Sequence, residues 1–484
     1  MRLERRKAQT SRGNELALTV DPTSRGGPGS MVWQDDKVYS SGADDVAAGL
    51  IQEENNELVV LNSAGTLVVH KPQSQEDCLA MMVMETLARE QAEDTWYRHV
   101  PQMLYRDPLV AVCFKPTCLA SRYRNQASRS RAAETIYTVM GEALRAIQLA
   151  LGSSPHAGGT GYFSCFLAIS GLSCFESLMG DRGLGAPDHM DGMLAVLTAC
   201  GIIPRATREL AHTVLDHHCM DLSIASCMRG EISPLEKLGG GIVSFLEASM
   251  SGKAESILDL KSTANDLCCR IPRLIWAVRE HFTQEDRLGW GLADACHLAK
   301  ELLRYTAESS ENAVLHDVHI VRVVHSTDSL VSQYATFYHD YWRFEALVRY
   351  WTARLTIIRV SFRLQSVSTT KNNLEIDARQ VLCKQATYLV RQLLMSHGYA
   401  RKISTPSRRR LWAHALVTVW GALADFAFAA EEKTTFLRSW VLQEVNLTLT
   451  PSMRFSRYDL DHAAELMVGG PLGGSYARLY TRKQ

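Results

Sequence analysis

Apolar residues at helical spacing run through residues 328–363, a stretch that contains no glycine and no proline. Steps of three or four positions place such residues on one face of an α-helix. The apolar positions are Phe337, Tyr341, Phe344, Val348, Trp351, Leu355, Ile358 and Phe362. The opposite positions include Asp340, Arg343, Arg349, Arg354 and Arg359. At about 1.5 Å per residue this helix would be roughly 50 Å long, so it needs a large helical body to pack against.

The same spacing predicts helices over most of the chain after residue 76. Residues 136–151 form a second apolar stripe that ends at Gly152, and residues 163–179 are apolar nearly all round, as in a buried central helix. Further helices are expected at residues 193–199, 205–228, 242–250, 254–282, 292–306, 376–396, 409–430 and 434–447. No period of about 20 to 50 residues repeats, so a regular repeat array is not indicated.

The pattern divides the chain into four parts. Residues 1–57 combine a basic start, a Ser/Gly/Pro-rich run and scattered acids, which is typical of a disordered head. Residues 58–75 hold one candidate hairpin and a linker, residues 76–447 the helical domain, and residues 448–484 a loose tail. The expected fold class is therefore all-α, a large irregular helical bundle or solenoid-like domain with at most one short hairpin.

Composition narrows the class of protein. Hydrophobic residues make up 46% of the 484 positions and charged residues 21%, which is enough for a sizeable core. Lys plus Arg and Asp plus Glu both number 52, so no overall charge favours nucleic acid or a membrane surface. No secretory signal follows Met1, and no apolar run reaches the about 18 residues of a membrane helix. The 12 cysteines are scattered mostly singly in apolar segments, which suits reduced, buried thiols.

Several groups of residues that can bind metals or take part in reactions are candidate sites. The densest is Asp216-His217-His218-Cys219 with His212 and Asp221. Adjacent histidines point about 100° apart on a helix, so a polar helix face is the simpler interpretation. Residues 158–161 lack the strand and lysine of a phosphate loop. We therefore predict no catalytic, cofactor-binding or metal-binding residue.

Two sets of side chains remain as candidates. The densest basic patch is a candidate nuclear import signal or phosphate contact, although solvated loop and helix-start charge also explain it. It consists of Arg401, Lys402, Arg408, Arg409 and Arg410. Three aromatic residues are candidates for lining a pocket between helices, although core packing is the simpler role. They are Tyr338, Trp342 and Trp351.

Several segments resemble, in pattern and in order, those of one known protein family. They are residues 96–120 with a Val-Pro step, 137–151, 166–176 followed by His189-Met190-Asp191-Gly192, 344–355 and 386–398. In pattern and order they resemble the all-helical regulatory region of fungal-specific transcription factors, over roughly residues 76–447. That region normally follows a cysteine cluster that binds zinc and reads DNA. Here the first cysteine is Cys78 and no Cys-x-x-Cys pair exists, so the zinc cluster is absent from this sequence.

The resemblance implies a non-enzymatic nuclear regulator of a fungal metabolic, or more narrowly secondary-metabolite, gene cluster. Its partners would be proteins, either a zinc-cluster regulator or a second copy. DNA would be reached only indirectly or through a domain outside this sequence, and no membrane is involved. Two alternatives stay open: a small-molecule binder or enzyme of secondary metabolism with a pocket between helices, and a structural α-solenoid scaffold.

Overall fold

The computed structural model describes most of the chain from residue 100 to residue 471 and short pieces before it. The described residues are 32–34, 57–61, 67–70, 74, 77–83, 100–123, 129–153, 160–179, 189, 192–193, 195–196, 205–237, 255–283, 292–323, 331–367, 373–402, 406–426, 431–449 and 454–471. The expected helix at residues 242–250 lies outside them. So does the expected disordered head, apart from residues 32–34 and Glu57.

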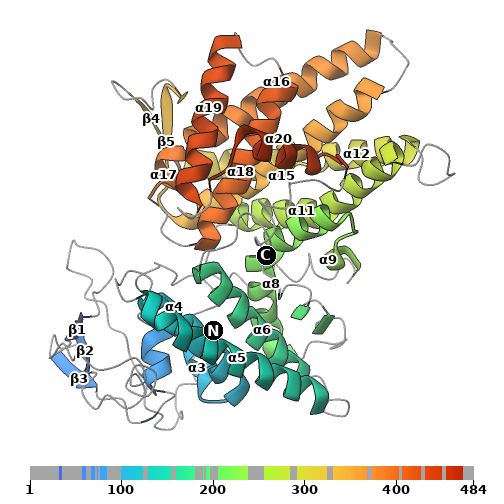
Figure 1. Ribbon diagram of the computed structural model, residues 1–484. Coiled ribbons are helices and arrows are strands. Elements are labelled where there is room, and N and C mark those ends of the chain that lie inside the picture. Colours follow the sequence, from blue (N-terminus) through green and yellow to red (C-terminus); the bar gives the residue numbers. More distant parts are fainter. Residues whose placement is uncertain are drawn as a thin grey trace, which may run out of the picture.

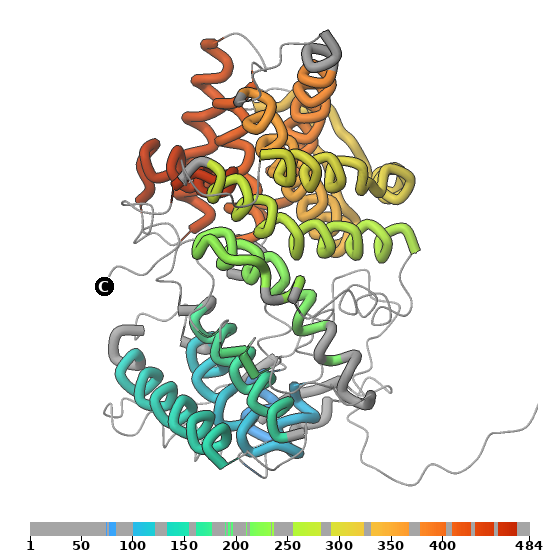
Figure 2. The backbone as a smooth tube through the Cα atoms, turned by 90° about the vertical axis from the view of Figure 1, so that its right-hand side faces the viewer, coloured from blue at the N-terminus to red at the C-terminus, as the bar shows by residue number. Residues whose placement is uncertain are grey.

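The fold is all-α, as expected, with helices arranged in two lobes (Figure 1). The first lobe contains α3 (Val100–Leu104), α4 (Pro108–Tyr123), α5 (Arg129–Ser153) and α6 (Thr160–Met179). The second contains α11 (Glu255–Thr283), α12 (Leu292–Arg304), α13 (Glu308–His316), α15 (Tyr341–Val367), α16 (Asn373–Met395), α17 (His397–Ala400), α18 (Pro406–Asp425), α19 (Glu431–Thr448) and α20 (Arg457–Leu466). Helix α8 (Arg205–Arg229), followed by the short α9 (Pro234–Lys237), lies between the lobes in both views (Figures 1 and 2).

Close helix packing builds the first lobe. Helix α4 packs against both α5 and α6. A Cβ atom at Gly171 of α6 would lie 2.7 Å from the Phe114 ring, so only glycine allows α4 and α6 to approach this closely. The hydroxyl of Thr117 donates to the Gly171 carbonyl at 2.8 Å across the same contact.

Helix α15 is the centre of the second lobe. It contacts α11, α12, α13, α16 and α18, and Phe344, Trp351 and Leu355 are fully buried. Arginines of the opposite face, including Arg349 and Arg359, are buried as well, so the helix is enclosed on all sides. The expected aromatic helix is thus present, but as a central helix rather than one with a charged outer face.

The start of α15 corrects the expected helix of residues 328–363. Residues 334–337 form strand β5, and the helix begins at Tyr341. The Asp340 carboxylate accepts a hydrogen bond from the Arg343 N–H at 2.9 Å, which satisfies an N-terminal amide of the helix. The aromatic spacing continues through the strand, so it could not reveal this boundary.

Short strands form two separate sheets. The expected hairpin is confirmed as β2 (Glu57–Leu61) and β3 (Leu67–His70), with β1 (Val32–Gln34) added on the β2 edge. A second hairpin, β4 (His319–Arg322) with β5 (Tyr334–Phe337), exceeds the single hairpin expected. Four-residue strands are too short to produce a readable alternation of apolar and polar positions.

Residues 454–471 also differ from the loose tail expected at residues 448–484. Helix α20 begins with a capping box in which Ser456 and Asp459 bond each other's backbone, and it buries Leu460 and Ala463. Arg279 of α11 donates to the carbonyls of Leu466 and Gly470 at 3.1 and 2.8 Å. Among the described helices, none has the length and apolar character needed to cross a membrane.

Candidate functional site

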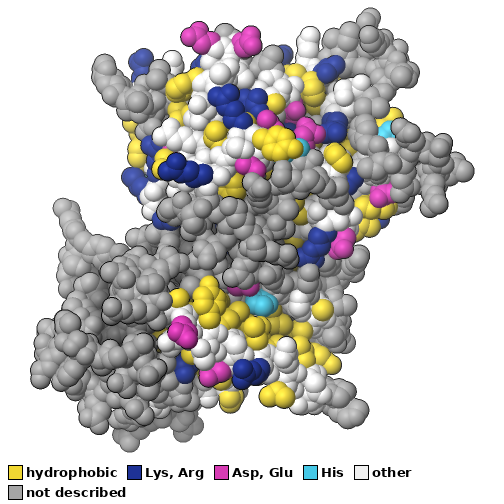
Figure 3. Space-filling view, in the orientation of Figure 1, with side chains coloured by type: hydrophobic (Ala, Val, Ile, Leu, Met, Phe, Trp, Pro, Cys, Tyr) yellow, Lys and Arg dark blue, Asp and Glu magenta, His cyan; other side chains and the backbone are white. Residues whose placement is uncertain are grey.

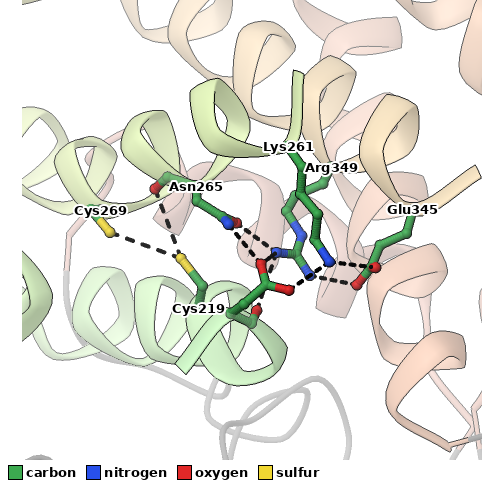
Figure 4. Close-up of polar contacts among 7 residues, drawn as sticks. Cys219, Lys261, Asn265, Cys269, Glu345 and Arg349 are labelled. Atoms are coloured by element: carbon green, nitrogen blue, oxygen red, sulfur yellow. Dashed lines mark hydrogen bonds and ion pairs between the residues drawn. The ribbon is translucent and has the colours of Figure 1, made fainter. Parts of the chain in front are cut away.

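A group of buried charged side chains lies where α8, α11 and α15 meet (Figure 4). Lys261 of α11 places its Nζ 2.5 Å from Asp216 Oδ2 and 3.0 Å from Glu345 Oε2. Arg349 of α15 donates to Asp216 Oδ1 at 3.0 Å and to Glu345 Oε1 at 2.6 Å. Asn265 joins the two sides, because its amide donates to Asp216 Oδ1 at 2.7 Å and accepts from Arg349 at 2.5 Å. We call these five residues the charge network.

Helical spacing explains how three elements build the charge network. Lys261 and Asn265 are four residues apart on α11, and Glu345 and Arg349 are four residues apart on α15. Residues at this spacing share a helix face, so each helix presents two polar side chains to the same point. Asp216 of α8 then completes the contacts from the third side.

The electrostatics favour full ionisation of the network. Burial by itself raises the pKa of Asp216, but Lys261 and Arg349 outweigh it and hold the pKa at about 2. Burial also acts against ionisation of Glu345, and the same two cations lower its pKa below the usual range. The two carboxylates, Asp216 and Glu345, balance the charge of the two cations. The Trp342 ring also lies 4.2 Å from Lys261 Nζ. This arrangement holds three helices together and leaves neither carboxylate available as a general base.

Cysteines lie beside the charge network. Cys219 donates to the Asn265 carbonyl at 3.8 Å, and its sulfur lies 3.9 Å from that of Cys269 (Figure 4). Burial raises the pKa of Cys268 well above its usual value and raises that of Cys227 to about 12. Protonated, buried thiols are poor nucleophiles. All described cysteines are free and most are buried, in agreement with the sequence analysis.

The histidines after Asp216 face the interior instead of forming an exposed polar helix face. Burial lowers the pKa of His217 to about 4, although Glu345 opposes the shift. His218 is buried, its pKa lies well below the usual value, and its ring packs edge-on against His217 with 4.8 Å between centroids. Within the described part of the chain, neither ring nitrogen of His218 has a hydrogen-bond partner. No group of three His, Cys, Asp or Glu residues among the described positions is arranged to hold a metal ion.

The described members of the predicted basic patch differ in burial and in their partners. Arg410 is buried and pairs with Asp221 of α8 at 2.8 Å. Arg401 pairs with the buried Glu444 of α19, with 3.2 Å between Nε and Oε2. Lys402 is exposed and lies 5.6 Å from the Phe337 ring centroid. Arg409 is half-buried, and the side chain of Arg408 lies outside the described residues.

The three aromatic candidates make separate contacts. Tyr338 shares a 2.6 Å hydrogen bond with Ser396, and Trp351 donates to Glu311 at 2.6 Å. Trp342 lies against Lys261 in the charge network. These contacts match the core-packing role and do not bring the three rings together at one site.

No sequence pattern singled out the charge network. One signal was present, because Glu345 and Arg349 form an oppositely charged pair four residues apart within an apolar helix. The partners Asp216 and Lys261 lie 133 and 84 residues away from Arg349 and Glu345, respectively. Local patterns contain no information about contacts at such separations.

Comparisons with known protein families, with curated proteins and with solved structures return no match for this chain.

Proposed function

We propose that this protein is a non-enzymatic regulator of transcription, built on a helical domain like the regulatory region of fungal zinc-cluster transcription factors. It acts in the nucleus through contacts with other proteins. The proposal rests on the order of the segments that resemble this regulatory region. Along the chain these segments lie on α3 and α4, on α5, on α6, on α15, and on α16 with α17.

The interior chemistry supports the non-enzymatic part of the proposal. The charge network pairs its carboxylates with cations, and the neighbouring histidines and cysteines are neutral and buried. General acid–base and nucleophilic catalysis require a group that is poised to exchange a proton or to attack a substrate. The described side chains of this cluster instead stabilise the contact between three helices.

The finer parts of the proposal follow from the resemblance. The protein controls a fungal metabolic gene cluster, and secondary metabolism is the specific case we propose. Its partner is a zinc-cluster regulator or a second copy of this chain, and DNA is reached through that partner or through a domain outside this sequence.

Chromatin immunoprecipitation of the tagged protein tests the proposal. We expect enrichment at the promoters of one co-regulated gene set, and loss of the protein should change transcription of the same set. An untagged strain is the control for antibody background. Binding of the purified protein to one enriched promoter, measured with and without nuclear extract, separates direct from partner-mediated contact. A stable, correctly expressed protein that associates with no promoter would exclude the proposal.

A further inference from the structure

Strand β4 is an exposed edge at one side of the second lobe (Figure 1). All four of its residues are exposed, including Ile320 at 52% and Val321 at 49%. Among the described strands, only β5 pairs with β4. An unpaired strand edge with apolar side chains on both faces is a template for adding another strand.

The register shows which backbone groups of β4 are available. The Val323 N–H donates to the Gln333 carbonyl at 2.9 Å, in the same register that pairs Val321 with Ala335. In an antiparallel ladder only alternate residues bond the facing strand. Ile320 and Arg322 therefore direct their N–H and C=O groups outward, away from β5.

The hairpin is anchored, which keeps this edge in place. Ala335 and Thr336 of β5 are buried, and β5 contacts α16 and α17. Tyr338, directly after β5, is bonded to Ser396 before α17. A partner strand would thus meet a positioned edge and would not have to order a free loop.

Three cations lie on or beside the hairpin. Arg322 lies on β4, Arg391 lies 5.6 Å from the ring centroid of Tyr334 on β5, and Lys402 lies 5.6 Å from that of Phe337 on β5. Among the described residues none of these three cations has a carboxylate partner. Figure 3 shows dark blue side chains gathered at the place of α17, next to the hairpin.

Nearby acids offset only part of this charge. Asp317 and Asp340 share one cation, Arg343, and Glu444 pairs with Arg401. Among these described side chains five cations stand against three carboxylates, so the charge beside the hairpin remains positive.

We infer that the outer edge of β4 binds an extended acidic segment of a partner protein, which adds to the hairpin as a third strand. Backbone groups of Ile320 and Arg322 would bond the incoming strand. Successive side chains of a strand alternate between faces, and β4 offers Ile320 with Arg322 on one face and His319 with Val321 on the other. A matching segment therefore carries an apolar residue and an acid on the face that meets Ile320 and Arg322.

Charge selects this occupant over a second copy of the chain. Pairing of two β4 edges would bring two copies of Arg322 and of the positively charged hairpin close together, and like charges across an interface are unfavourable. The inference rests on the proposed function, because it names the surface and the partner chemistry of the protein contacts made by the regulator.

Peptide binding to the full-length protein tests the inference. The probe is a fluorescein-labelled peptide of two Val-Val-Glu-Glu repeats, which places valine and glutamate in turn on each face; its length of about eight residues is typical of a strand. We expect saturable binding by fluorescence anisotropy that weakens as salt rises, because salt screens exposed charges. A matched peptide with lysine in place of glutamate should not bind, and neither should the acidic peptide with alternate backbone nitrogens methylated.

Variants locate the binding edge. Ile320→Pro removes an outward N–H without removing a bond to β5, and should weaken binding at least about tenfold, whereas Ile320→Thr keeps the N–H and should weaken it no more than about threefold. Arg322→Glu should weaken binding about tenfold. Arg457→Glu, the same charge change at the exposed start of α20, should leave binding unchanged. Circular dichroism confirms that each variant is folded.

Several outcomes would overturn the inference. These are no binding of the acidic peptide, equal binding of the acidic and basic peptides, and equal binding of the methylated peptide. Sedimentation that shows a dimer abolished by Ile320→Pro would identify the occupant as a second copy. Displacement of the peptide by a single-stranded oligonucleotide, together with equal binding of the methylated peptide, would identify the cations as a phosphate site.

Failure of the β4 inference and failure of the proposed function give different experimental results. Loss of peptide binding in Arg322→Glu with unchanged promoter association would leave the edge as a peptide site not needed for chromatin contact. If the wild-type protein associated with no promoter, the proposed function would be excluded, whereas the measured peptide binding at β4 would still stand.

Discussion

Arginines in the interior of this protein bond groups that helices leave unsatisfied. Arg354 donates to the carbonyls of Leu302 and Leu303 near the end of α12, at 3.2 and 2.8 Å. Arg279 donates at 3.0 Å to the Cys227 carbonyl near the end of α8, and it also bonds the end of α20. The last carbonyls of a helix have no partner within the helix, and a guanidinium carries several donors. A single buried arginine can therefore satisfy the ends of two helices.

Removal of one cation from the charge network should be costly. Arg349→Met leaves Asp216 and Glu345 buried with one cation between them, and we expect a loss of about 3–5 kcal/mol in the free energy of unfolding. Urea unfolding followed by tryptophan fluorescence measures it. The control is Arg363→Met at a more exposed pair with Glu465, which should cost less than about 1 kcal/mol.

A double variant tests whether balance of charge is the cause. Adding Glu345→Gln to Arg349→Met removes one of the two carboxylates that share the remaining cation. The losses in the free energy of unfolding of the two single variants should therefore sum to more than the loss of the double variant. Equal costs for Arg349→Met and Arg363→Met would contradict a stabilising role for the charge network.

Acid should destabilise the protein through its buried histidines. Burial lowers the pKa of His414 and of His217 to about 4, whereas an unfolded histidine titrates near 6.5. Between these values the unfolded state binds protons that the folded state does not, so stability falls as pH falls from about 6.5 to about 4. Each of these two histidines contributes up to about 1.4 kcal/mol per pH unit in this window.

His218 isolates this effect. Neither ring nitrogen has a partner among the described residues, so His218→Leu should raise the free energy of unfolding by about 1 kcal/mol at pH 7.5. The variant should also lose less stability than the wild type between pH 7.5 and pH 5.5, measured by urea unfolding at both values. The control is His297→Leu, the same substitution at an exposed position of α12. A His218→Leu variant that is less stable at pH 7.5 would contradict the prediction.

At the scale of elements, close approach of helices depends on single glycines. A Cβ atom at Gly421 of α18 would overlap the guanidinium of Arg359 on α15. That guanidinium is held by Asp425 at 2.6 Å and by the Ala464 carbonyl at 3.2 Å, so it has little freedom to move. The contact joins α15, α18 and α20 at one point.

Gly421→Ala should therefore destabilise the protein, although alanine has the higher helix propensity. We expect a loss of about 2 kcal/mol from overpacking, seen as a lower Tm in thermal unfolding. The matched control is Gly141→Ala in α5, where a Cβ meets no atom of the described structure within 4 Å. There the same substitution should stabilise by about 0.5–1 kcal/mol. The same sign of change at both positions would exclude the packing explanation.

Across the whole molecule, one continuous apolar core runs through both lobes. Helix α8 packs on α11, and α6 of the first lobe contacts α18 of the second. Shared burial of this kind favours a single cooperative unfolding transition over separate unfolding of the lobes.

Cysteines in both lobes can report on that cooperativity. Burial raises the pKa of Cys113 and Cys118 in the first lobe and of Cys227 in α8 to about 12, so their thiols should resist alkylation in the native state. In a urea series with pulsed iodoacetamide labelling and mass spectrometry, all three should become reactive over the same urea range. Cys383, which is half-buried, should label without urea. Earlier labelling of the first-lobe cysteines would show that the lobes unfold independently.

The sequence by itself determined the all-α fold, the apolar helix around Trp351 and the burial of most thiols. These follow from residue spacing within a single element, where neighbours in sequence are neighbours in space. The β2–β3 hairpin was predictable for the same reason, because its strands are joined by a short turn.

Only the tertiary structure decided which charged residues lie inside. Asp216, Lys261 and Glu345 come together from three helices, and α20 is held by Arg279 from a distant part of the chain. Whether a polar side chain is buried depends on a partner that offsets the cost of removing it from water, and that partner has no fixed separation in sequence. The exposed edge of β4 likewise depends on the contacts that hold β5 against α17, which no local pattern specifies.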